Sequence, residues 1–111
     1  MTYEIRITKK AKKDIKLATK QGKNIELLFE IVYKLSEGEV LEPKYNDHKL
    51  SGEYEGKREC HIEPDFLLVY EIREKEIVLY LVGVGVMHIY LNRKREPILL
   101  SFLINKKLMT I

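Results

Sequence analysis

The sequence has very little cysteine and no long hydrophobic run. Cys60 is the one cysteine among 111 residues, so an internal disulfide framework is excluded and a zinc ribbon lacks its ligands. No apolar stretch approaches the length of a membrane span. Lys9 and Lys10 follow a short mixed segment instead of an apolar signal segment. We therefore expect a cytoplasmic protein with no membrane partner.

The length of the chain and its charge distribution indicate how many domains it forms and what kind of partner it suits. A chain of this size predicts one domain that buries a core without crosslinks. Residues 1–23 carry eight basic and two acidic side chains, residues 24–80 carry seven and fourteen, and residues 81–111 carry five and one. Basic ends suit a polyanion such as RNA, although a solvated lysine face on a helix is the simpler interpretation of the charge alone.

The N-terminal third predicts a strand and two helices. Residues 2–8 alternate apolar and charged side chains, which is typical of a half-buried strand. Residues 9–21 predict a lysine-rich helix with a narrow apolar stripe, capped by Thr8 and stopped by Gly22. A second helix, capped by Asn24 and ended by Gly38, has a stronger apolar stripe made of Ile25, Leu28, Phe29, Val32 and Leu35.

The remainder predicts a loop followed by three strands. Residues 39–56 are rich in turn residues and predict a loop that contains His48. Pro64 separates two strands at 57–63 and 66–72, and the apolar residues 77–82 predict a central strand. The order strand, helix, helix, strand, strand, strand predicts an α+β two-layer fold, with one antiparallel sheet covered by a helical hairpin.

The segment KRECHIEPDFLLVY at 57–70 concentrates the chemistry. Strand alternation places Glu59 and His61 on one face and turns Arg58 to the other. The tight turn at Pro64 brings Asp65 close to the edge of the charged face. Imidazole and carboxylate groups in this arrangement are suited to proton transfer near neutral pH.

Together with LEPKYNDHKLSG at 41–52, this segment resembles the YafQ toxins of the RelE/ParE-like superfamily. The spacing of His48, His61 and Asp65 carries the resemblance, which covers residues 1 to about 82. It implies a RelE-like two-layer fold and a toxin of a type II toxin-antitoxin system that acts as a ribosome-dependent mRNA endoribonuclease. The implied reaction uses the RNA 2′-OH and no metal or other cofactor. The implied partners are the ribosome, mRNA and a cognate antitoxin of the DinJ or RelB kind.

The resemblance also implies a set of site residues. The catalytic candidates are His48, His61, Asp65 and His88. The histidines would transfer protons or contact phosphate, and Asp65 would act as a base or orient an imidazole, while the assignment of acid and base stays open. Candidates for substrate contact are Glu59, Phe66, Lys9, Lys12, Lys13 and Lys16. Of these, Glu59 could instead orient His61. Phe66 could stack on a base, although periodicity alone favours a place in the core.

The sequence departs from the family pattern after residue 82. Where the YafQ pattern has arginine and histidine, this chain has Gly83 and Met87, and a histidine follows one place late at His88. We therefore divide the chain into a toxin domain, 1–91, and an atypical extension, 92–111. One codon choice for 84–92, read two bases later, encodes Gly-Cys-His-Ala-Tyr-Leu-Phe-Glu, so a shifted reading frame from about residue 83 is our hypothesis. The alternative is a natural apolar extension whose helix begins at Pro97.

Three other functions compete with the nuclease. A metal site from His48, His61, Asp65 and His88 lacks a tight ligand spacing and ranks below metal-free chemistry. A RelE-like scaffold that binds an antitoxin without cleaving RNA is the stronger alternative, because the family arginine and histidine are absent. A generic RNA-binding α+β domain is supported only by the basic ends.

Overall fold

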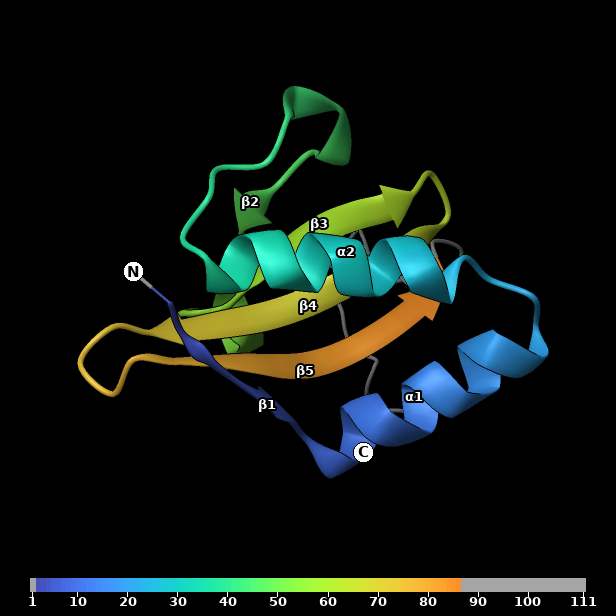
Figure 1. Ribbon diagram of the computed structural model, residues 1–111, viewed down its shortest axis with the longest axis horizontal. Helices are drawn as coiled ribbons and strands as arrows, with labels where there is room; N and C mark the ends of the chain where they lie inside the picture. The colour runs from blue at the N-terminus through green and yellow to red at the C-terminus, as the bar shows by residue number, and fades with distance from the viewer. Residues whose placement is uncertain (1, 87–111) are drawn as a thin grey trace.

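The computed structural model describes residues 2–86, which form a five-stranded sheet and two helices (Figure 1). In chain order the elements are β1 (Glu4–Ile7), α1 (Lys9–Lys20), α2 (Ile25–Ser36), the 3₁₀ helix η1 (Pro43–Tyr45), β2 (His48–Lys49), the 3₁₀ helix η2 (Gly52–Tyr54), β3 (Arg58–Glu63), β4 (Phe66–Arg73) and β5 (Val78–Val86). The predicted α+β class is confirmed. The predictions for His88 and for 92–111 lie outside the described residues.

The sheet is mixed, with the strand order β1-β5-β4-β3-β2. The pairs β2–β3, β3–β4 and β4–β5 are antiparallel, but β1 runs parallel to β5, with Glu4 opposite Val78 and Ile7 opposite Leu81. The prediction of one wholly antiparallel sheet was therefore wrong. A tight hairpin forces antiparallel pairing, whereas β1 reaches β5 only through both helices and three other strands, so nothing local fixes its direction.

Both helices begin at the predicted caps. The Thr8 hydroxyl accepts a hydrogen bond from the Ala11 backbone N–H at 3.1 Å, and the Asn24 side-chain oxygen accepts one from the Leu27 N–H at 3.0 Å. The Thr8 hydroxyl also donates to the Leu81 carbonyl at 3.0 Å. This second bond ties the start of α1 to the middle of β5, so the cap also fixes the place of the helix against the sheet.

The core lies between α2 and the sheet (Figure 1). The buried side chains of α2 are Leu28, Ile31, Val32 and Leu35. The predicted stripe included Phe29, but this side chain is 40 % exposed and Ile31 takes its place. Positions 28, 31, 32 and 35 correspond to i, i+3, i+4 and i+7, which lie on one face of a helix. α1 buries only Ala11 and Ala18, as its narrow stripe predicts.

The segment 39–57 is more ordered than the predicted loop. It contains η1, η2 and the two-residue strand β2, which begins at His48. β2 pairs antiparallel with β3, so that His48 lies opposite Glu59 and Lys49 opposite Arg58. The prediction of a loop position for His48 was wrong in this respect, and the correction matters because pairing with β3 fixes His48 relative to His61.

Candidate active site

Two imidazoles meet where β2 begins alongside β3. His48 lies opposite Glu59 in the strand register, and His61 is two residues further along β3 on the same face. The ring centroids are 6.4 Å apart and the ring planes are inclined by 50°. This separation lets both rings contact a single phosphodiester. The pairing of two short strands thus brings together the two histidines singled out in the sequence.

His48 is held between two hydrogen-bond acceptors. Its Nδ1 lies 2.7 Å from the carbonyl oxygen of Asn46, and its Nε2 lies 3.2 Å from Oε1 of Glu59. An imidazole donates from both nitrogens only when it is protonated. The hydrogen bond with Glu59 accordingly raises the pKa of His48 above its ordinary value, against the opposing effect of partial burial. The site therefore favours the cationic form of His48.

The pKa of His61 is shifted in the opposite direction to that of His48. Partial burial lowers its pKa below the ordinary value, and the neighbouring His48 lowers it further, while Glu59 and a hydrogen bond to the Pro64 backbone act in the other direction. Its Nε2 lies 3.4 Å from the side-chain amide nitrogen of Asn46. Two nearby titratable groups whose pKa values are pushed apart are the usual basis of an acid and base pair.

A second cluster, underneath His48, anchors β2. The hydroxyl of Tyr70 donates to Oδ1 of Asp47 at 2.7 Å, and Nε of Arg58 donates to the same oxygen at 3.2 Å. Tyr70 is almost fully buried on β4, opposite Arg58 in the register. Asp47 precedes His48, so this cluster fixes the backbone that carries the imidazole. It also shows why Arg58 is a poor phosphate ligand, since its guanidinium is committed to Asp47.

Sequence reasoning missed Asn46 and Asp47 as site residues. Both were interpreted only as turn residues between two apolar positions. The available signal was their place directly before a candidate catalytic histidine, because asparagine and aspartate side chains bond to nearby groups as readily as they form turns.

Glu59 and Asp65 have partners that differ from the predicted ones. Glu59 is 8 % exposed and its Oε1 lies 3.2 Å from Nε2 of His48, so its contact is with His48 and not with His61. Its role in substrate contact stays a prediction. The Asp65 carboxylate is exposed and forms an ion pair with Lys23 at 3.2 Å, in the connection between α1 and α2. A role for Asp65 as a base or as the partner of an imidazole stays a prediction.

The other predicted substrate contacts lie away from the histidines. Phe66 has no exposed surface and belongs to the core, so it cannot stack on a base while the fold is intact. This corrects its assignment as a substrate-binding residue. Lys9, Lys12, Lys13 and Lys16 are exposed on α1, which packs on β5, two strands from β3 in the sheet (Figure 1). They form a separate basic surface.

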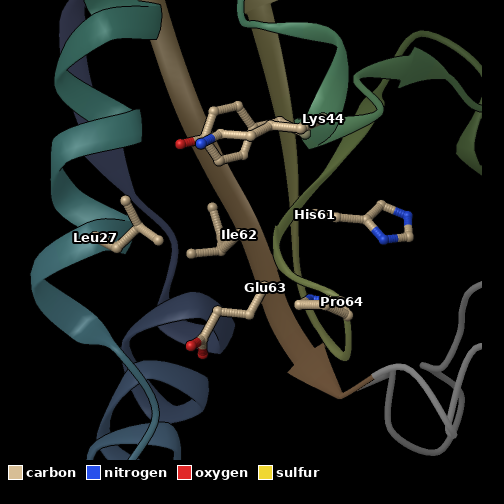
Figure 2. A pocket seen from close by; sticks show the side chains of 7 residues that line it. Leu27, Lys44, His61, Ile62, Glu63 and Pro64 are labelled. Atoms are coloured by element: carbon tan, nitrogen blue, oxygen red, sulfur yellow. The ribbon is translucent and has the colours of Figure 1, made fainter.

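A surface pocket of about 530 Å³ adjoins His61. Its lining residues are Leu27, Lys44, Tyr45, His61, Ile62, Glu63 and Pro64. Figure 2 shows Leu27 of α2 facing Ile62 across the pocket, while the ring of His61 points away from both. The ammonium of Lys44 lies 5.2 Å from the centre of the Tyr45 ring. The pocket therefore combines apolar surfaces with the cation of Lys44 and the carboxylate of Glu63, next to the strand that carries His61.

Two kinds of feature are absent from residues 2–86. Within that part of the chain, no three His, Cys, Asp or Glu side chains are grouped closely enough to hold a metal ion. The metal site weighed from the sequence would need His88, which lies beyond the described part. No helix between residues 2 and 86 is long and apolar enough to cross a membrane.

A family profile and a sequence relative of this chain both carry the name YafQ. The profile of the family described as "Bacterial toxin of type II toxin-antitoxin system, YafQ" matches residues 3–91. The mRNA interferase toxin YafQ of Escherichia coli K12 is 38 % identical over 64 residues, which are 57 % of this chain and 70 % of that protein.

Solved structures agree with the sequence relatives. A metal-bound toxin from Helicobacter pylori has a TM-score of 0.73 and 41 % identity, covering 78 % of this chain and 97 % of its own. YafQ from Escherichia coli BL21(DE3) has a TM-score of 0.72 and 30 % identity, covering 78 % and 96 %. The Escherichia coli DinJ–YafQ toxin-antitoxin complex has a TM-score of 0.71 and 30 % identity, covering 79 % and 96 %. The chain belongs to the YafQ family of bacterial toxins of type II toxin-antitoxin systems.

Proposed function

We propose that this toxin is an mRNA endoribonuclease that acts on the ribosome in the cytoplasm and uses the RNA 2′-OH as its nucleophile. The name mRNA interferase, given to two relatives from Escherichia coli, supports the choice of substrate. The observation that carries the proposal is the pair His48 and His61, 6.4 Å apart, with one pKa raised and the other lowered. This is the arrangement that metal-independent RNA cleavage requires, with one proton donor and one proton acceptor ready near neutral pH.

The proposed reaction assigns one proton transfer to each histidine. His61 takes the proton of the 2′-OH, and the oxygen attacks the adjacent phosphorus. The P–O5′ bond breaks, and the leaving O5′ takes the proton on Nε2 of His48, which points at Glu59 in the free protein. Before that transfer, the positive charge of His48 stabilises the phosphorane. The products are a 2′,3′-cyclic phosphate and a 5′-OH.

The surroundings of the pair supply further contacts in this proposal. The pocket beside His61 offers the Tyr45 ring and Pro64 as flat surfaces for a base and Lys44 as a cation for phosphate. The exposed lysines of α1, which are separate from the histidines, would contact the RNA backbone outside the reacting nucleotide. Contacts of that kind add affinity that falls with salt and carry no sequence information.

The chemistry is tested by replacing the scissile nucleotide in an mRNA programmed into translating ribosomes. A 2′-deoxy nucleotide at that place should abolish cleavage by the toxin, and an all-ribose mRNA should give 2′,3′-cyclic phosphate and 5′-OH ends. The control is a 2′-deoxy nucleotide several positions away, which should leave the cut intact. Cleavage of the 2′-deoxy substrate, or 5′-phosphate ends, would refute the proposed mechanism.

We further propose that the toxin binds a cognate antitoxin. The Escherichia coli relative forms a complex with DinJ. Three large apolar side chains on α1 and α2 are substantially exposed, namely Leu17, Phe29 and Tyr33. They supply apolar contact area for a partner. Coexpression with the antitoxin encoded beside the toxin gene should give a stable complex, and replacing Leu17 and Tyr33 by glutamate should weaken it at least tenfold.

A scaffold that binds the antitoxin without cleaving RNA is the second candidate. Gly83 favours it, because glycine has no side chain to replace the arginine that the YafQ pattern has at this position. A Cβ atom at this position would lie 3.2 Å from both Oδ2 of Asp14 and Nζ of Lys10. Asp14 also accepts a hydrogen bond from the Val84 backbone at 3.0 Å. Thus the place where the YafQ pattern has arginine adjoins an ion pair of α1. If the chain does not cleave mRNA, the double variant Gly83→Arg and Met87→His should gain cleavage. No gain would argue that the loss of this arginine and histidine is not the cause of the inactivity.

A further inference from the structure

Asn46 lies at the junction of the two histidines in an uncommon backbone conformation. It ends η1 with φ 47° and ψ 49°, in the left-handed region, and its N–H donates to the Pro43 carbonyl at 2.9 Å. Asparagine tolerates this region better than most residues other than glycine. The turn after η1 therefore depends on the residue type at 46.

The backbone carbonyl and the side-chain amide of Asn46 contact different imidazoles. Its backbone carbonyl lies 2.7 Å from Nδ1 of His48, and its side-chain amide nitrogen lies 3.4 Å from Nε2 of His61. A carbonyl only accepts and an amide NH₂ only donates. The first contact thus requires a proton on His48 Nδ1, and the second requires a free lone pair on His61 Nε2. The second contact is long, as hydrogen bonds in an unliganded active site often are.

We propose that Asn46 is a positioning residue that holds His48 as the proton donor and His61 as the proton acceptor of the pair. This proposal deepens the nuclease function proposed above and rests on it. One residue with a fixed backbone conformation would then set both the orientation and the hydrogen-bonding state of two side chains from different strands.

The carboxylates around the pair oppose a neutral His61. Glu59 favours a proton on both imidazoles, and Asp47 favours one on His48. Lys44 and Glu63 line the pocket beside His61 and carry opposite charges. The neighbouring carboxylates alone would thus drive both rings toward the cation. The amide of Asn46 acts with partial burial and the charge on His48 to keep His61 neutral.

Two substitutions at Asn46 separate its backbone role from its side-chain role. Asn46→Gly accepts the positive φ, so the turn and the carbonyl contact to His48 stay while the amide is lost. Asn46→Asp keeps the shape and tolerates the same φ, but it presents an acceptor to His61 and so stabilises the protonated ring. The control is Asn24→Asp, which adds the same charge at the N-cap of α2, where aspartate caps as well as asparagine.

The first measurement is a long-range ¹H–¹⁵N NMR titration of the histidines in the free toxin. In the wild type and in Asn24→Asp, Nε2 of His61 should carry no proton at neutral pH. In Asn46→Gly the ring keeps only the hydrogen bond to the Pro64 carbonyl as a restraint on its tautomer, so a larger share of molecules than in the wild type should carry the proton on Nε2. In Asn46→Asp the ring should titrate at higher pH than in the wild type. An unchanged tautomer and an unchanged titration of His61 in both Asn46 variants would overturn the proposal.

The second measurement is the pH profile of mRNA cleavage on ribosomes. Asn46→Asp should cleave about tenfold or more slowly than the wild type at pH 6, and the gap should narrow at pH 8 as His61 loses its proton. A loss that is equal at all pH values would contradict the proposal, because a merely structural defect gives that result. The NMR result needs no substrate, so an inactive wild type would count against the nuclease function and not against the role of Asn46.

Discussion

The substitution Tyr70→Phe tests whether the cluster beneath His48 stabilises the fold and the site together. It removes one hydroxyl and leaves the buried ring in place. The lost contact is the 2.7 Å hydrogen bond to Asp47, whose carboxylate keeps Arg58 at 3.2 Å. Tyr70 is 1 % exposed and the Asp47 side chain is 19 % exposed, so water only partly replaces the missing donor.

The size of the effect follows from the kind of hydrogen bond. A hydrogen bond to a charged group contributes roughly 1.5–3 kcal/mol to the free energy of unfolding. The ion pair that remains with Arg58 places the expected loss near the middle of that range, about 2 kcal/mol. In a domain of this size, such a loss lowers the melting temperature by about 5–10 °C. The β2 backbone at His48 should also loosen, because Asp47 precedes it.

The assay is urea unfolding of the wild type, Tyr70→Phe and Tyr80→Phe. Tyr80→Phe is the matched control, because the hydroxyl of Tyr80 makes only an exposed 3.4 Å contact with Arg6, and its loss should cost less than about 0.5 kcal/mol. NMR chemical shifts of His48 should move in Tyr70→Phe and not in Tyr80→Phe. Equal stability losses in the two variants, with His48 unmoved, would refute the anchoring role of the cluster.

Two other predictions concern the core and pH. Leu28→Ala deletes a side chain of α2 that has no exposed surface, so the free energy of unfolding should fall by about 2–5 kcal/mol in urea titrations, whereas a loss below about 1 kcal/mol would contradict its place in the core. Folding raises the pKa of His48, so its contribution to stability should be full below the ordinary value of 6.5 and should disappear as pH rises through the folded-state pKa. Urea unfolding across pH 5–9 checks this, since His48→Gln should remove that part of the pH dependence; an identical pH dependence in the variant would contradict it.

The sequence predicted local structure well because local chemistry determines it. Thr8 and Asn24 cap their helices as expected, since a cap needs only a side-chain oxygen and a backbone N–H three residues on. The direction of β1 was predicted wrongly, because the apolar pattern of a strand does not indicate which neighbour it pairs with or in which sense. The exposure of Phe29 has a similar cause, since two overlapping apolar stripes fit the same helix and only packing on the sheet selects one.

The candidate site was predictable in part. The resemblance to the YafQ toxins, carried by the spacing of His48, His61 and Asp65, selected both rings, and strand alternation placed Glu59 and His61 on one face. The opposite pKa shifts of the two rings were not predictable. The raised pKa of His48 depends on the register that puts Glu59 against it and on the carbonyl of Asn46, and the lowered pKa of His61 depends first on its partial burial. The burial of Phe66 likewise required the packed core, since an aromatic residue after a turn suits both a binding surface and an interior.

The most direct test of the nuclease is cleavage of mRNA on translating ribosomes by the purified toxin and by His61→Ala. Glu39→Ala is the control, because Glu39 is exposed in the loop after α2. The account predicts that the wild type and Glu39→Ala cleave the message and arrest growth when expressed, while His61→Ala is at least a hundredfold slower. Equal cleavage by the wild type and His61→Ala, or no cleavage by the wild type, would contradict the assignment of His61 as the base of an active ribonuclease.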